Sequence, residues 1–140
     1  MEIATAIDFA RQHRRGVLVT MKRDGRPQLS NVAYGVGDDG VVRISITADR
    51  AKYHNAVRDQ RVSLHVARDD FYAYAVIDGD AAVSAVAADA DDATVDELVA
   101  LYRIIAGEHG DWHEYRAAMV SDRRAVLRLS PTHAYGMLPS

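Results

Sequence analysis

The stretch Val42-Arg43-Ile44-Ser45-Ile46-Thr47-Ala48-Asp49-Arg50-Ala51-Lys52 predicts a β-strand that leads directly into the first turn of a helix. Its first half alternates, because three apolar residues point to one side while Arg43, Ser45 and Thr47 point to the other. Asp49 is of a residue type that caps helix N-termini, and we expect a two-turn helix over residues 51–58. The stretch therefore predicts a strand–helix unit, with one buried face on the strand.

The same stretch predicts a phosphate-binding site. It places the hydroxyls of Ser45 and Thr47 and the cations of Arg50 and Lys52 beside a helix N-terminus. Exposed backbone N–H groups and the positive end of the helix dipole both favour an anion there. The spacing alone favours the alternative, surface charges on a half-exposed strand, because clustered charges indicate functional sites only statistically.

Outward from this unit, short apolar runs alternate with turn signals such as Asp24-Gly25 and Gly37-Asp38-Asp39-Gly40. We expect Gly79 to form a turn between two strands and Pro131 to end the last strand. Thr94 and Glu97 fit a capping box, and Gly107 fits a helix end. The expected strands are 17–21, 26–36, 41–47, 61–67, 72–77, 80–85 and 124–129, and the expected helices are 3–14, 51–58, 95–106 and one that opens at 111–114.

These elements indicate a mainly β protein with added helices, of the α+β class. Strands joined as hairpins, with a short helix and a helical pair inserted, predict a small antiparallel barrel with peripheral helices. The lack of regular strand–helix alternation argues against a parallel Rossmann sheet. With 140 residues, no internal repeat and no linker, we expect one domain over residues 1–140.

Composition narrows the possible functions. The formal charge of −3 argues against general nucleic-acid binding, which needs an excess of Lys and Arg. The absence of cysteine excludes thiol catalysis and thiolate metal sites. No apolar run reaches transmembrane length and no signal-peptide core is visible, so we expect a cytoplasmic protein without a membrane partner.

No side chain stands out as a catalyst. Only His109 and His113 of the six histidines are spaced four apart, and Gly110 lies between them. The sequence has no HExxH, G-x-S-x-G or P-loop pattern, so no metal site and no nucleophile is predicted. The sequence therefore identifies no catalytic residue.

A second polar stretch, Arg26 to Val32, lies in an expected strand. Gln28 and Ser30 share one face of it, and Asn31 lies on the other. Gln and Asn are poor strand formers, and when buried they need hydrogen-bond partners. The edge of a heteroaromatic ring would satisfy them, as would strand backbone or water.

Four blocks of the chain together resemble one known family. They are Gly25-Arg26-Pro27-Gln28-Leu29-Ser30-Asn31-Val32, Arg50-Ala51-Lys52, Ile105-Ala106-Gly107-Glu108-His109 and Asp122-Arg123-Arg124. In this order they are similar to the pyridoxamine-phosphate-oxidase-like split-barrel flavoproteins, and most similar to the actinobacterial branch that uses the deazaflavin coenzyme F420. The similarity extends from about residue 16 to residue 135.

The resemblance implies an antiparallel split β-barrel of the FMN-binding type that forms a homodimer with two sites at the subunit interface. Arg50 and Lys52 of one chain would hold the cofactor phosphate, and the other chain would close over the ring. The aromatic block Phe71-Tyr72-Ala73-Tyr74 would form a wall of the partner's site. The cofactor-binding residues implied are Gln28, Ser30, Asn31, Ser45, Thr47, Arg50, Lys52, Asn55, Tyr72 and Tyr74.

The chemistry implied is hydride transfer from the reduced deazaflavin to a small conjugated acceptor, with no side-chain nucleophile. An FMN-dependent enzyme of the oxidase type is the alternative, because the same phosphate anchor suits either cofactor. A non-catalytic protein that binds or carries F420 is the other alternative.

Overall fold

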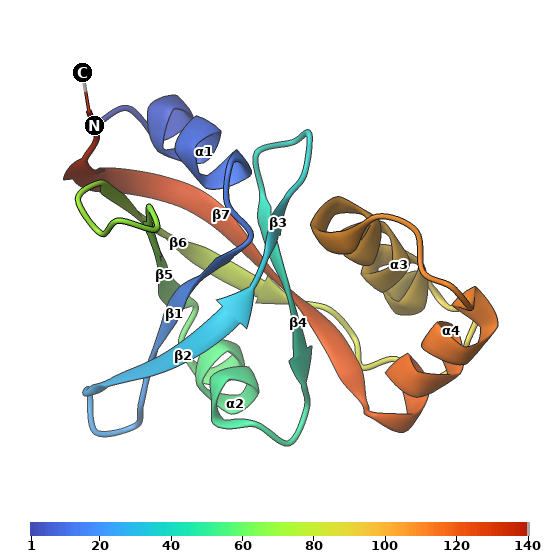
Figure 1. Cartoon of the computed structure of the whole chain (residues 1–140). Helices are drawn as coiled ribbons and strands as arrows, with labels where there is room; N and C mark the ends of the chain where they lie inside the picture. The colour runs from blue at the N-terminus through green and yellow to red at the C-terminus, as the bar shows by residue number, and fades with distance from the viewer. Residues whose placement is uncertain (140) are drawn as a thin grey trace.

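The computed structural model describes residues 1–139 as one seven-stranded antiparallel sheet with four helices (Figure 1). The strand order is β2-β1-β5-β6-β7-β4-β3. The helices are α1 (Ile3–Arg11), α2 (Ala51–Arg58), α3 (Ala93–Ala106) and α4 (Trp112–Ser121). The strands are β1 (Arg15–Met21), β2 (Pro27–Ala33), β3 (Gly35–Val36), β4 (Val42–Thr47), β5 (Arg61–Ala67), β6 (Tyr74–Val83) and β7 (Arg124–Met137).

The sheet curls around an apolar interior, which confirms the predicted split barrel of the α+β class. Val42, Ile44 and Ile46 of β4 are fully or almost fully buried, as their alternation predicts. Apolar residues of β1, β5, β6 and β7 face the same interior, while α1 and α2 pack against it. We call this side of the sheet the inner face and the opposite side the outer face.

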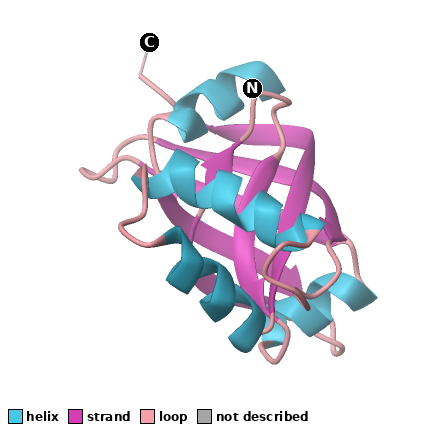
Figure 2. Cartoon of the chain, turned by 90° about the vertical axis from the view of Figure 1, so that its right-hand side faces the viewer, coloured by secondary structure: helices cyan, strands magenta, loops and turns pink. Residues whose placement is uncertain are grey.

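The helical pair α3–α4 lies on the outer face, over β4 and the beginning of β7 (Figure 2). Val126 of β7 points to this side and packs in a second apolar cluster with Val95, Leu98 and Met119. Across β1, β2, β5, β6 and the end of β7, no helix among residues 1–139 packs on the outer face. The outer face is therefore half covered.

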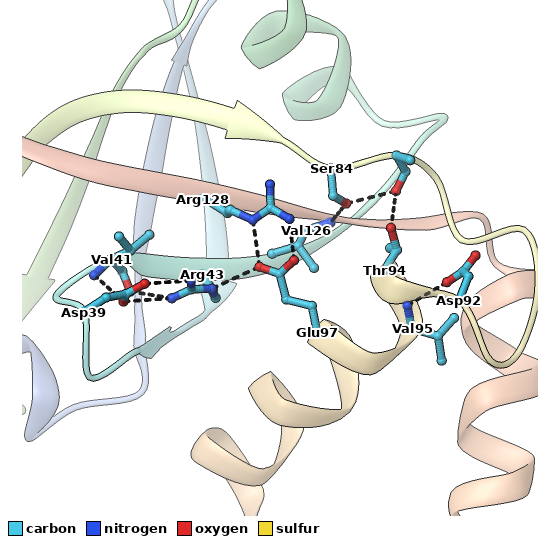
Figure 3. Close-up of polar contacts among 11 residues, drawn as sticks. Asp39, Val41, Arg43, Ser84, Asp92, Thr94, Val95, Glu97, Val126 and Arg128 are labelled. Atoms are coloured by element: carbon cyan, nitrogen blue, oxygen red, sulfur yellow. Dashed lines mark hydrogen bonds and ion pairs between the residues drawn. The ribbon is translucent and has the colours of Figure 1, made fainter.

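An ion-pair network anchors α3 to the sheet (Figure 3). Glu97 accepts hydrogen bonds from Arg128 Nε at 2.8 Å and from Arg43 Nε at 3.0 Å, and Arg43 also pairs with Asp39. These guanidinium groups lower the pKa of Glu97, Arg128 having the largest effect. The predicted capping box is therefore wrong, because Glu97 is engaged with the sheet and does not reach back to the helix end.

Caps differ from the prediction at two helices. Asp92 is the N-cap of α3 and accepts from Val95 N, while the Thr94 hydroxyl donates to Ala85 O. Arg50, and not Asp49, occupies the N-cap position of α2, without a side-chain cap bond. At α4 the side chain of Asp111 caps the helix, as its position before the apolar stripe indicates.

The prediction of two strands around Gly79 is wrong, because β6 is continuous through it. A register shift between Asp78 and Gly79 marks a β-bulge, not a turn. A Cβ on Gly79 would lie 2.3 Å from Ser130 O, so the glycine allows β7 to approach closely. Pro131 lies opposite this bulge, and β7 therefore continues to Met137 where the sequence predicts an end.

The predicted strand 26–36 is divided at Tyr34. Its first part, β2, pairs with β1, and its last part, β3, pairs with β4 at the other edge of the sheet. Tyr34 is buried, and its hydroxyl donates a hydrogen bond to Ala10 O at 2.7 Å near the end of α1. This helix ends at Arg11, three residues before the predicted end.

None of the described helices is long and apolar enough to cross a bilayer.

Candidate functional site

The predicted phosphate-binding residues of β4 lie beside Arg124, at the start of β7. Thr47 is the register partner of Arg124, and Ser45 is the partner of Val126. Because paired residues of antiparallel strands point to the same face, Ser45, Thr47 and Arg124 all lie on the outer face. The Arg124 Nη1 donates to Ser45 Oγ at 3.5 Å.

The side chain of Arg124 has an unsatisfied donor. Its Nε is buried and has no hydrogen-bond partner, the only such side-chain atom among residues 1–139. The nearest carboxylate oxygen, Asp122 Oδ2, lies 4.0 Å away, too far for a hydrogen bond. A buried guanidinium N–H without an acceptor is costly, so this group favours a ligand that supplies one.

Arg50 and Lys52 add two positive charges at the beginning of α2. Neither forms an ion pair with any carboxylate in the part of the chain that the structure describes. The pKa of Lys52 is lowered by partial burial and further by the charges of Arg50 and Arg124. Three mutually repelling cations therefore surround one small region, which we call the anion anchor (Ser45, Thr47, Arg50, Lys52 and Arg124).

The anion anchor has the donor set that a phosphate group requires. Two guanidinium groups can each donate in a fork to phosphate oxygens, and an ammonium adds a point charge. Bound phosphate would supply the acceptor that Arg124 Nε lacks and would offset the repulsion that lowers the pKa of Lys52. The residues present thus fit the phosphate of a nucleotide-like cofactor.

Asn55 of α2 lies close to the anion anchor in sequence, but its side chain is buried in the core. Its Nδ2 donates to Thr20 Oγ1 at 3.2 Å, and its Oδ1 accepts from Arg58 Nη2 at 3.0 Å. Asn55 and Thr20 are both buried. Asn55 and Ala56 take the inward positions of α2, whereas Val57 is 60% exposed.

The predicted ring-edge residues of β2 are divided between the two faces of the sheet. Gln28 pairs with Thr20 and Ser30 pairs with Leu18, so both point to the inner face, toward α2. Asn31 pairs with Val17 and points to the outer face. There it borders a groove of about 650 Å³ together with His65, Arg15 and apolar residues.

Tyr72 and Tyr74 lie far from the anion anchor of the same chain. Tyr74 pairs with Met137 at the end of β7, whereas Arg124 begins that strand, and Figure 1 shows the two ends of β7 at opposite sides of the molecule. β7 has 14 residues, so at about 3.3 Å per residue the path along the strand between these ends is at most about 45 Å. Tyr74 stacks on His65 at a centroid distance of 5.5 Å, and Tyr72 is 81% exposed.

Arg124 is not among the site residues predicted from the sequence, although it belongs to the block Asp122-Arg123-Arg124 that resembles the family. Alternation in the predicted strand 124–129 places Arg124 and Arg128 on one face, which is a visible signal. What the sequence does not show is that this strand pairs with β4, and the pairing brings Arg124 to Thr47.

The fold is a split barrel, and cations lie at the end of β4 and at the start of α2. The family model described as pyridoxamine 5'-phosphate oxidase matches residues 4–138. The chain therefore belongs to the pyridoxamine 5'-phosphate oxidase family, as its sequence blocks indicate.

Solved structures share this fold. A conserved hypothetical protein of Mycobacterium tuberculosis, Rv2991, is 23% identical over 97% of this chain and 84% of its own, with a TM-score of 0.74. A protein named F420 reductase is 22% identical over 87% of this chain and 89% of its own, with a TM-score of 0.66. HutZ, a haem storage protein from Vibrio cholerae, is 18% identical over 96% of this chain and 94% of its own, with a TM-score of 0.67.

Proposed function

We propose that this protein is an F420-dependent oxidoreductase that transfers a hydride from the reduced deazaflavin to a small conjugated acceptor. The observation that carries the proposal is the anion anchor, in which the buried Nε of Arg124 lacks an acceptor beside two cations without carboxylate partners. Membership of the pyridoxamine 5'-phosphate oxidase family supports a phosphate-bearing ring cofactor at such an anchor. The likeness to a protein named F420 reductase supports the deazaflavin.

In this proposal Arg50, Lys52 and Arg124 hold the cofactor phosphate, and Ser45 and Thr47 donate from the same face of β4. The anchor positions the cofactor without taking part in the chemistry. The bound deazaflavin supplies the hydride, and the protein orients the ring against the acceptor and excludes water. A dedicated side-chain nucleophile is not required for this reaction class.

We also propose that the working form is a homodimer. The anion anchor and the aromatic residues Tyr72 and Tyr74 lie at opposite ends of β7, so one chain alone cannot place both around one ring. Exposed apolar side chains lie near Tyr74, among them Phe71 and Tyr72 of the preceding loop and Met137, the register partner of Tyr74. An exposed apolar surface of this kind is typical of a subunit interface. A second copy would bring its aromatic end to the first copy's anchor.

In such a dimer the groove at Asn31 would become part of a closed ring site. Asn31 offers an amide at its wall, and Val17 and Phe71 offer apolar surface for a flat ring. Gln28 and Ser30 face the interior near α2, so they would act on the ring edge from the inner side or support α2. A flat conjugated acceptor would stack against the ring in the remaining space.

FMN is the alternative cofactor, because the anchor recognises phosphate and not the ring. A non-catalytic role is the second alternative, and one of the similar structures is named a haem storage protein. Both alternatives retain the anion anchor as the phosphate site. The first differs from the proposal in the cofactor that is bound, and the second in having no turnover.

Oxidation of reduced F420, followed by its absorbance across a panel of α,β-unsaturated carbonyl compounds and quinones, tests the proposal. We expect turnover with at least one acceptor and its loss in Lys52→Ala. Stoichiometric F420 binding without turnover on any acceptor would favour the carrier function. Turnover with FMN alone would favour the oxidase-type alternative.

A further inference from the structure

A second group of cations lies at the other end of α2, away from the anion anchor. A groove of about 350 Å³ is lined by Lys22, Arg23, Gly25, Arg58, Asp59 and Arg61. It lies between the β1–β2 hairpin and the segment that joins α2 to β5. In Figure 1, α2 separates this hairpin from the end of β4.

The positive charge of this groove is only partly compensated. Asp59 is occupied by Arg61, whose Nε and Nη2 donate to its two oxygens at 3.0 and 2.7 Å. Lys22, Arg23 and Arg58 form no ion pair within residues 1–139. Three free positive charges therefore line one small groove on a protein whose overall charge is −3.

The groove is also preorganised at one wall. Arg58 Nη2 donates to Met21 O at 2.5 Å and to Asn55 Oδ1 at 3.0 Å, which fixes the plane of its guanidinium. The other N–H groups of this exposed side chain stay available to a ligand. A held guanidinium loses little entropy when it binds an oxyanion, in contrast to a free surface arginine.

The hairpin also carries a carboxylate, Asp24, which forms no ion pair with the groove cations among residues 1–139. Asp24 Oδ1 accepts from the backbone N–H of Arg26 at 3.0 Å, so this side chain is turned toward its own turn. Gly25, with φ of +85°, closes the turn and has no heavy atom near its Cβ position. The hairpin therefore presents Lys22 and Arg23 to a groove that is open to solvent.

We propose that this hairpin groove is a second anion site, which binds a small oxyanion carrying two or more negative charges. The match of three uncompensated cations to such a ligand is the main reason, since a singly charged ion would leave repulsion among them. The volume suits a small phosphate or carboxylate compound and not a macromolecular surface. The site stands apart from the anion anchor, because the eight residues of α2 span about 12 Å.

The test uses the full-length protein without cofactor and two probes, inorganic pyrophosphate and citrate. Binding is followed residue by residue by 1H–15N correlation NMR. The hairpin variant Lys22→Gln/Arg23→Gln is compared with the anchor variant Arg50→Gln/Lys52→Gln. The matched control Arg11→Gln/Arg14→Gln removes the same charge from exposed positions at and just after the end of α1.

We expect saturable shifts of the amides of residues 22–26 with at least one probe, and at least tenfold weaker binding there in the hairpin variant. The anchor variant and the control are expected to keep that affinity within about twofold. The probe that binds more tightly identifies phosphoryl or carboxylate ligands as the natural class. No saturable hairpin shift with either probe, or an equal loss in the control, would overturn the proposal. Loss in the anchor variant alone would assign all binding to the first site.

Discussion

Arg124 Nη1 lies 3.5 Å from Ser45 Oγ across the β4–β7 ladder, while Nε of the same guanidinium is buried without an acceptor. A guanidinium held by one weak contact, with a buried donor left over, is stabilised when an oxyanion completes its hydrogen bonds. Through this contact of Arg124, β7 contributes to the proposed anion anchor together with β4 and α2.

Arg124→Ala should weaken binding of a phosphate-bearing cofactor by about 1.5–3 kcal/mol, the range for hydrogen bonds to charged groups. The expected effect on folding is small, because the substitution removes an unsatisfied donor. Isothermal titration with FMN and F420 measures the affinity, and Arg14→Ala is a control at an exposed cation outside the anchor. Unchanged affinity would remove Arg124 from the site.

Lys52→Ala should have a similar effect, about 1.5–3 kcal/mol of lost cofactor binding. In the wild type, burial and the charges of Arg50 and Arg124 hold the pKa of Lys52 below 10.5. A bound phosphate favours the protonated ammonium, so binding should raise this pKa, and affinity should fall as pH rises through the lowered value. NMR titration of the Lys52 side chain with and without inorganic phosphate measures both.

For Lys52→Met we expect a flatter dependence of phosphate affinity on pH over the same range. A wild-type affinity that is constant over this pH range, with an unshifted Lys52 titration, would show that the ammonium does not contact the anion.

The lowered pKa of Lys52 also makes the stability of the fold depend on pH. A lowered lysine pKa makes the protonated form costly in the fold, so stability should rise as pH increases from the folded toward the unfolded pKa.

Glu97→Gln should destabilise the protein at neutral pH by about 2 kcal/mol, because Arg43 and Arg128 lose a charged acceptor. Their guanidinium groups lower the pKa of Glu97 from 4.5. The stabilisation is therefore complete above about pH 4.5 and is lost as pH falls through the lower folded value. Urea unfolding at several pH values measures it. Glu114→Gln, at an exposed site, should change little, and an equal loss there would contradict the assignment.

Asn55→Ala should lower the free energy of unfolding by about 1–3 kcal/mol, because Thr20 Oγ1 is left buried without its partner. The structure assigns Asn55 to the core, so cofactor affinity of the folded variant should stay within about threefold. Thermal unfolding and titration on the same sample separate the two effects. Normal stability with strongly reduced affinity would instead support the direct cofactor contact that the family resemblance implies.

The dimer proposal predicts that Tyr72→Glu and Met137→Glu shift the protein from dimer to monomer in sedimentation velocity experiments. Both side chains are well exposed, Tyr72 at 81% in the loop before β6 and Met137 at 65% at the end of β7. Val57→Glu is the matched control, since Val57 is 60% exposed on α2. A wild-type monomer that binds cofactor normally would contradict the proposal.

The sequence predicts the barrel and four of the five anchor residues, all except Arg124, because those signals are local. The alternation of Val42, Ile44 and Ile46 identifies a strand with one buried face, and the position of Arg50 and Lys52 follows from the next helix. The family blocks extend the fold prediction to about residues 16–135.

The remaining features depend on contacts distant in sequence. Glycine is common in turns, and Gly79 is therefore predicted as one. The close approach of Ser130 makes the position a bulge in a long strand instead. Arg124 enters the anchor only through the pairing of β7 with β4, which no local pattern specifies. Glu97 likewise fits a capping box locally, while two arginines of the sheet compete for its carboxylate.

Parallel titration of the purified protein with F420 and FMN, followed by the distinct absorbance of each ring, tests the central claim most directly. We expect stoichiometric binding of F420, tighter than that of FMN, and weakened for both by Lys52→Ala and by Arg124→Ala. Tight stoichiometric FMN binding with no measurable binding of F420 would contradict the assignment of this protein as an F420-dependent enzyme.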